Sequence, residues 1–101
     1  MAYSCKILET ARLELENIAR YLVVDAGSPK AAGDFLDEFD RLVEDLAVHP
    51  LRFALSRMPE LAAQGYRCAL VGSYAILFKV VEDVVYIAHI FHQRQDYAQL
   101  V

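Results

Sequence analysis

The strongest constraint on the fold lies in the second half of the chain, where three β-rich runs follow one another with two residues between them. The runs span residues 66–71, 74–81 and 84–91, and the two gaps contain Gly72-Ser73 and Glu82-Asp83. Because so short a gap joins neighbouring strands as a tight hairpin, the pattern predicts an antiparallel three-stranded meander.

The middle run, residues 74–81, also predicts which side of this sheet is buried. Successive side chains of a strand point to opposite faces. One face of this run is entirely apolar and consists of Tyr74, Ile76, Phe78 and Val80. Lys79 belongs to the other face, so we expect it to point away from the rest of the domain.

The first half of the chain predicts one short strand and two helices. Residues 3–8 alternate as a half-buried strand does, and apolar residues then recur at three- and four-residue steps from an N-cap at Thr10. Gly27 is a helix stop, and Ser28-Pro29 starts a second amphipathic helix that ends at His49-Pro50. Two such helices form an antiparallel hairpin. Residues 50–65 are expected to be irregular.

The order strand, two helices, three strands predicts an α+β fold in which the helical hairpin covers one face of one small sheet. With 101 residues, 56% of them hydrophobic, residues 1–101 are expected to form a single domain. The longest uncharged run, residues 68–78, is shorter than the roughly 20 residues of a membrane helix. The N-terminus lacks the pattern of a signal peptide, so we expect a cytoplasmic protein.

Charge argues against a protein that holds nucleic acid by bulk electrostatics. The net charge is −4, and phosphate binding depends on Lys and Arg. Residues 1–50 carry five basic and ten acidic side chains, whereas residues 51–101 carry five basic and four acidic ones. Any anion-binding surface is therefore expected in the second half, and the acidic helix faces are expected to be solvated surfaces.

Several kinds of site are not expected. Cys5 and Cys68 are too few for a metal cluster and are expected to be small buried thiols rather than a disulfide. His89 and His92 lie three residues apart on a strand, which places them on opposite faces, so a shared metal is not expected. His89 is expected in a polar gap and His92 at the end of the strand. We expect no cofactor.

The candidate site residues belong to the sheet half. They are Arg67, Lys79, His92, Arg94 and Tyr97, with Tyr74 nearby in sequence. A cation, an imidazole and a phenol that converge at the sheet edge would bind phosphate and move protons, as RNA cleavage by the ribose 2′-hydroxyl requires. The alternative for Arg67 is structural, either a pair with Asp96 or a bond to a backbone carbonyl.

The chain resembles the RelE/ParE superfamily of bacterial toxins from type II toxin–antitoxin systems, of the plasmid stabilisation type. The matching pattern comprises Ala11, Leu15, Ile18 and Tyr21-Leu22, then Phe35 to Leu46 and Pro50, then Tyr66-Arg67, Tyr74 to Val80, and Ile87 to Tyr97. The last segment resembles the family's apolar strand followed by His-x-Arg-x-Asp. The family fold is a small antiparallel sheet packed on a helical hairpin.

The resemblance implies a growth-inhibiting protein that a cognate antitoxin neutralises. One branch of the family cuts messenger RNA on the ribosome, and the other acts on DNA gyrase. Ala75 stands where the ribonuclease branch commonly has an arginine, and the chain is acidic, which favours the ParE-like gyrase branch. Gln95 replaces a frequent second arginine and weakens anion binding in either branch.

Three functions remain open from the sequence. The first is a gyrase-directed toxin in which Arg67, Tyr74, Lys79, Arg94 and Tyr97 bind the target or the antitoxin. The second is a ribosome-dependent endoribonuclease in which Arg67, Lys79 or Arg94 stabilises phosphate and His92 or Tyr97 moves protons. The third is a non-toxic binding module whose exposed apolar surface is covered by an antitoxin helix or, in a homodimer, by a second copy of the chain.

Overall fold

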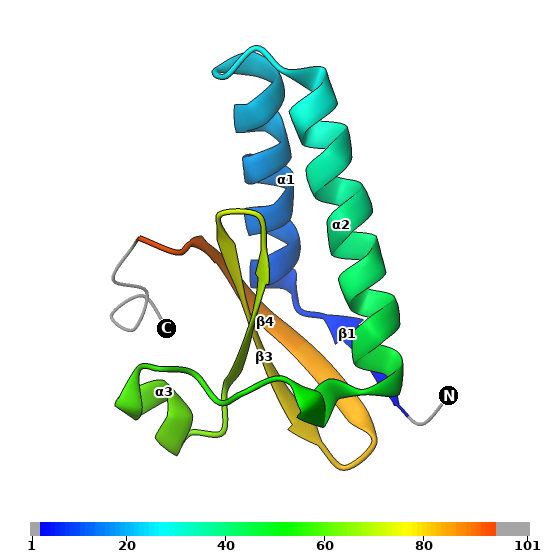
Figure 1. Cartoon of the computed structure of the whole chain (residues 1–101), viewed down its shortest axis with the longest axis vertical. Helices are drawn as coiled ribbons and strands as arrows, with labels where there is room; N and C mark the ends of the chain where they lie inside the picture. The colour runs from blue at the N-terminus through cyan, green and yellow to red at the C-terminus, as the bar shows by residue number, and fades with distance from the viewer. Residues whose placement is uncertain (1–2, 95–101) are drawn as a thin grey trace.

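The computed structural model describes residues 3–94, and they form one sheet with helices on both of its faces (Figure 1). The elements are β1 (Ser4–Ile7), α1 (Glu9–Val24), α2 (Pro29–Val48), the 3-10 turn η1 (Pro50–Arg52), α3 (Pro59–Ala63), β2 (Arg67–Val71), β3 (Tyr74–Val81) and β4 (Val84–His92). This order is the α+β arrangement that the sequence predicts.

The sheet has the strand order β1-β4-β3-β2. Strands β2, β3 and β4 form the predicted antiparallel meander, in which Val71 pairs with Tyr74 and Val81 pairs with Val84 across the two tight turns. Strand β1 adds to the far side of β4 in parallel, with Ser4 opposite Val84. The parallel pairing is possible because the long stretch of chain between β1 and β4, which includes both long helices and the other two strands, lets β4 return in the direction of β1.

The helical hairpin begins and ends close to the predicted positions. Ser28 caps α2 as predicted, because its hydroxyl oxygen accepts a hydrogen bond of 3.1 Å from the Ala31 N–H. The prediction for α1 was wrong by two positions, since the N-cap is Leu8, the helix begins at Glu9 and Thr10 lies inside it. The cap residue Leu8 makes no side-chain cap bond, and the helix follows β1 directly.

The main core lies between this hairpin and the sheet. Figure 1 shows α1 and α2 side by side, extending past the sheet at the end where they are joined. The predicted inner face of β3 is confirmed, because Ile76 and Phe78 are fully buried among residues of α2 and β4 while Tyr74 and Val80 are partly buried. Phe78 meets the ring of Phe53 edge-on, with ring centroids 5.9 Å apart.

The prediction that residues 50–65 are irregular was wrong in part, and the outer face of the sheet is covered there. The segment begins with η1 and ends in α3, which brings the fully buried Leu61 onto that face. Leu61 forms a second apolar cluster with Ala75, Leu77 and Phe91. Outward-pointing residues of β3 are therefore buried as well, beneath the five-residue helix α3 and the flanking Met58 and Tyr66.

Candidate functional site

A cleft of about 590 Å³ lies where α1 passes the adjoining ends of β3 and β4. Helix α1 supplies four of its lining residues and the strands supply the other four. They are Glu14, Asn17, Ile18 and Tyr21 from α1, and Tyr74, Ile90, Phe91 and His92 from the sheet. The cleft therefore combines a carboxylate, an amide, two phenols and an imidazole with an apolar floor. This variety makes it the candidate functional site.

Tyr74 and His92 are brought together by the hairpin register. Tyr74 opens β3 and His92 closes β4, and they are opposite partners in the ladder. Their rings lie 5.5 Å apart at 77°, and Tyr74 also meets Phe35 edge-on at 5.1 Å. Burial, followed by the nearby Tyr21, raises the pKa of the Tyr74 phenol, because both disfavour its ionised form.

Glu14 holds α1 against a strand edge. Within the described residues, strand β1 pairs with β4 only as far as Ile87. The edge of β4 that follows Ile87 faces α1 instead. There the Ile90 N–H donates a hydrogen bond of 2.8 Å to Glu14 Oε1. His89 Nδ1 lies 3.6 Å from the other carboxylate oxygen. Glu14 is thus an exception to the prediction that helix carboxylates are solvated.

We predict that Glu14→Ala destabilises the fold by about 1–3 kcal/mol, because a largely buried N–H of Ile90 loses its acceptor. Glu14→Gln keeps an acceptor oxygen and should cost less. Urea unfolding measures both, with Glu16→Ala as the control, because Glu16 is exposed and pairs with the exposed Arg12. Equal stability of the Glu14→Ala protein and the parent would show that this bond does not hold the edge.

A bulge in β4 accounts for the placement of the two histidines. Leu77 pairs with His89 and Phe78 pairs with Ile87, which leaves Ala88 as the extra residue. After the bulge, His92 lies on the cleft side beside Tyr74, whereas His89 stacks on Phe91 with ring centroids 5.3 Å apart. His92 ends the strand, as predicted, whereas His89 lies between Phe91 and Glu14 with its Nδ1 buried and making no hydrogen bond to the described residues.

The structure places Lys79 away from this cleft. Lys79 lies on the outer face, as predicted, with its Nζ over the ring of Tyr66 at 4.4 Å from the centroid. Tyr74 lies five residues before Lys79 on β3, which corresponds to about 17 Å along a strand, and its side chain points to the opposite face. The predicted convergence of a cation with the imidazole and a phenol therefore does not include Lys79.

The two candidate arginines have different surroundings. Arg67 donates a hydrogen bond of 2.6 Å from Nη1 to the carbonyl oxygen of Phe53, which is the structural alternative predicted for it. Arg94 is exposed just beyond β4, and its backbone N–H donates to His92 Nδ1 at 3.2 Å. Tyr97 and Asp96 lie outside the described residues.

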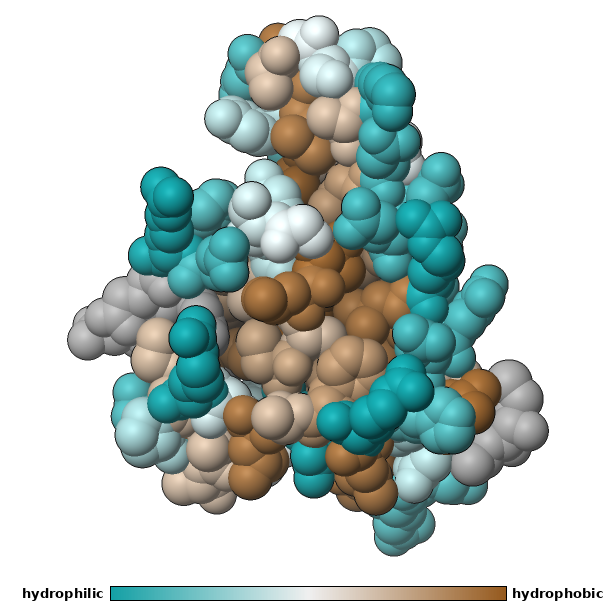
Figure 2. All heavy atoms as spheres, in the orientation of Figure 1, coloured by the Kyte–Doolittle hydropathy of each residue, from teal (hydrophilic) through white to brown (hydrophobic). Residues whose placement is uncertain are grey.

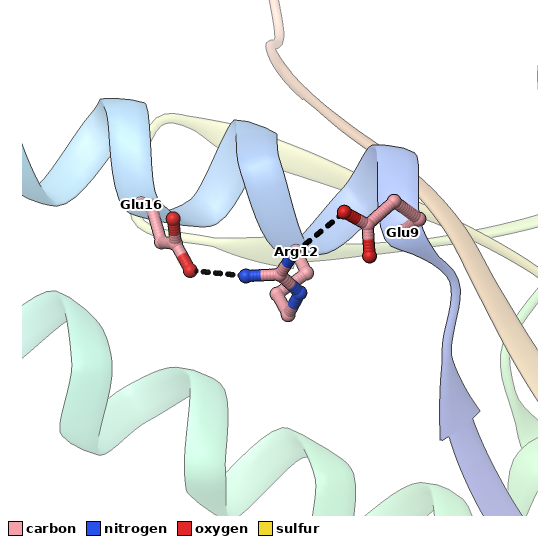
Figure 3. Close-up of polar contacts among 3 residues, drawn as sticks. All are labelled: Glu9, Arg12 and Glu16. Atoms are coloured by element: carbon pink, nitrogen blue, oxygen red, sulfur yellow. Dashed lines mark hydrogen bonds and ion pairs between the residues drawn. The ribbon is translucent and has the colours of Figure 1, made fainter.

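The rest of the acidic helix surface fits the prediction of a solvated face. Figure 2 shows hydrophilic residues along the outer side of α2, beside an apolar strip between the two helices. On α1, the exposed Arg12 bridges Glu9 and Glu16 at 2.6 Å each (Figure 3). These bonds raise the pKa of Arg12, with Glu9 contributing most. Exposed pairs of this kind contribute little to stability.

Sequence reasoning missed three of the five polar residues of the cleft, namely Glu14, Asn17 and Tyr21. Their spacing was a usable signal, because residues three and four apart share one face of a helix. Ile18, which lies between them, was assigned to the buried stripe, and the polar neighbours that flank it line the cleft.

Two other properties of the described residues bear on the kind of site. Within residues 3–94, His, Cys, Asp and Glu side chains form no group of three or more that would hold a metal ion. None of the helices in this range is both long and apolar enough to span a bilayer. Cys5 and Cys68 are half-buried and are not joined in a disulfide, and burial raises the pKa of the Cys5 thiol.

Comparison with known proteins assigns the family. Residues 6–97 match the family model described as the ParE toxin of the type II toxin–antitoxin system parDE. The chain belongs to the ParE toxin family. The resemblance predicted from its sequence is thereby confirmed, and the match includes all eight residues that line the cleft.

Solved structures agree with the ParE toxin assignment. A chain of the chromosomal ParDE system from P. aeruginosa is 22% identical, with a TM-score of 0.72 over 90% of this chain and 96% of that one. A chain of the RelBE2 toxin–antitoxin complex from Mycobacterium tuberculosis is 25% identical, with a TM-score of 0.59 over 91% and 99%. No protein with a curated description matches this chain significantly.

Proposed function

We propose that this ParE-family toxin inhibits growth by acting on DNA gyrase in the cytoplasm, and that a cognate antitoxin binds and neutralises it. The observation that carries the proposal is the match of residues 6–97 to the ParE toxin model. The gyrase branch of the superfamily is also the branch that the acidic composition and Ala75 favour.

The positions of the basic residues support gyrase over RNA as the target. RNA cleavage needs a proton acceptor, a proton donor and a phosphate-stabilising cation within hydrogen-bond reach of one phosphodiester. Lys79 and His92 lie on opposite faces of the sheet, and the guanidinium of Arg67 is bonded to the Phe53 carbonyl. Of the predicted cationic residues in the described range, Arg94 is the one nearest to His92 along the chain, two positions after it.

Exposed apolar side chains support a protein partner. Val24 at the end of α1 is 69% exposed and Leu70 on β2 is 61% exposed. Both structural neighbours come from toxin–antitoxin systems, and one is described as a toxin–antitoxin complex. An antitoxin segment that covers such side chains would block access of the toxin to its target.

A ribosome-dependent endoribonuclease is the second candidate, because the RelBE2 chain from Mycobacterium tuberculosis is similar over nearly its full length. In that case His92 and Arg94, which lie two residues apart at the end of β4, would carry the chemistry together with Tyr97, because Lys79 lies on the other face of the sheet and Arg67 is bonded to the Phe53 carbonyl. Messenger RNA cleavage in a translation extract would then fall sharply in the His92→Ala and Arg94→Ala proteins.

The gyrase proposal is tested with purified proteins. We expect the toxin to inhibit supercoiling of relaxed plasmid by DNA gyrase, and the antitoxin, added at equal molar amount, to restore it. Relaxation by a type I topoisomerase is the control and should be unaffected. Supercoiling that proceeds unchanged at saturating toxin would rule out gyrase as the target.

A further inference from the structure

The side chains that line the cleft between α1 and the ends of β3 and β4 favour a positively charged ligand. Among residues 3–94, its lining contains one acidic side chain, Glu14, and no Lys or Arg. We propose that the cleft binds an arginine side chain presented by a partner polypeptide. The proposal goes beyond the proposed function, because neither gyrase nor the identity of an antitoxin enters the argument.

The carboxylate of Glu14 is placed to receive a guanidinium. Its side chain is 24% exposed, so it is accessible from the cleft yet screened less by water than the carboxylates of the helix surface. Oε1 accepts the Ile90 N–H and Oε2 lies 3.6 Å from His89 Nδ1, and because each carboxylate oxygen has two lone pairs, both oxygens can accept a further bond. The bond from Ile90 also fixes the direction of the carboxylate, so little side-chain entropy is lost when a partner binds.

The aromatic side chains provide surfaces on which a guanidinium stacks. Tyr21 is 52% exposed at the mouth of the cleft, and Tyr74 lies deeper beside His92. Both faces of a phenol ring attract cations, and arginine stacks on such rings more readily than lysine. Ile18, Ile90 and Phe91 provide apolar surface for the methylene stem of the same side chain.

A second cleft indicates that the ligand is a polypeptide rather than a free small molecule. This cleft, of about 250 Å³, lies on the α2 side of Tyr74 and carries Asp34 and Glu38 among its lining residues. Lys30 pairs with Asp34 at 2.8 Å, and the carboxylate of Glu38 remains for a ligand. The two clefts, each with an acidic side chain in its lining, lie on either side of Tyr74. They suit a peptide segment, extended or helical, that carries basic residues.

The test uses two probes that differ in charge but hardly in shape. N-acetyl-arginine amide and its neutral isostere N-acetyl-citrulline amide are titrated into the ¹⁵N-labelled full chain at low salt. We expect the arginine probe to shift the backbone amides of Ile18, Tyr21, Tyr74 and Ile90, with an affinity at least about threefold higher than that of citrulline, as a partly buried ion pair implies.

Glu14→Gln is the decisive variant, because it removes the charge and keeps an acceptor for the Ile90 N–H. We expect the arginine probe to bind this variant no better than citrulline does. Glu16→Gln removes an exposed carboxylate from the same helix and should leave the preference for arginine unchanged. Tyr21→Ala alters the exposed wall of the cleft and should weaken binding of the arginine probe about two- to fivefold. This is the range for a cation over an exposed aromatic ring.

Three results would overturn the proposal. The first is equal affinity of the parent chain for the two probes, and the second is shifts confined to amides outside the cleft. The third is an undiminished preference for arginine in the Glu14→Gln protein. If the spectrum of Glu14→Gln reveals a changed fold, the Tyr21→Ala result decides, and an unchanged affinity there would overturn the proposal.

Discussion

Phe78→Ala is expected to remove much of the stability of this protein. Phe78 has no exposed surface and stands at the centre of β3, where it meets the ring of Phe53 and the core side of α2. Truncating a buried phenylalanine costs about 3–5 kcal/mol, because the apolar surface is lost and a cavity remains. Domains of this size have total stabilities of roughly 5–15 kcal/mol.

The measurement for Phe78→Ala is urea unfolding followed by circular dichroism. Val81→Ala is the matched control, since Val81 ends the same strand and is 52% exposed. It should change the stability by no more than about 0.5 kcal/mol. A Phe78→Ala protein with the midpoint of the parent would contradict the position of the core between the helical hairpin and the sheet.

Leu61→Ala is expected to have the second largest effect, because it tests whether α3 seals the outer face of the sheet. Leu61 is 1% exposed and packs with Ala75, Leu77 and Phe91. Truncation of a buried leucine costs about 2–5 kcal/mol. A five-residue helix has no stability of its own, so its order depends on this contact.

Loss of the Leu61 contact should also release α3 locally. Hydrogen exchange is expected to speed up at the amides of residues 59–66 before the rest of the sheet is affected. Leu70→Ala is the control, because Leu70 is on the outer side of β2 and is 61% exposed. A Leu61→Ala protein as stable as Leu70→Ala would mean that the outer face is open.

The elements with strong local signals were predictable. The two-residue gaps determined the meander and its register, and Ser28-Pro29 determined the start of α2. Tyr74 and His92 face each other because that register makes them partners. Lys79 points outward because it follows the inward-pointing Phe78 directly, and successive side chains of a strand point to opposite faces.

The remaining features depend on long-range packing that leaves no local pattern. Five residues are too few for a helical period to be recognised, so α3 and its burial of Leu77 were missed. The bulge at Ala88 does not interrupt the apolar run of β4. Helix periodicity places Glu14 and Tyr21 on one face of α1, but it does not specify that this face crosses the edge of β4, and their roles follow from that crossing.

Pulse labelling of a bacterial host in the first minutes after induction of the chain alone tests the central claim most directly. DNA synthesis and protein synthesis are followed together, and co-expression of the antitoxin is the control. The gyrase proposal predicts that DNA synthesis fails first and that the antitoxin prevents the failure. Protein synthesis that fails first would contradict it in favour of a ribonuclease, and normal synthesis of both would leave a binding module without toxicity.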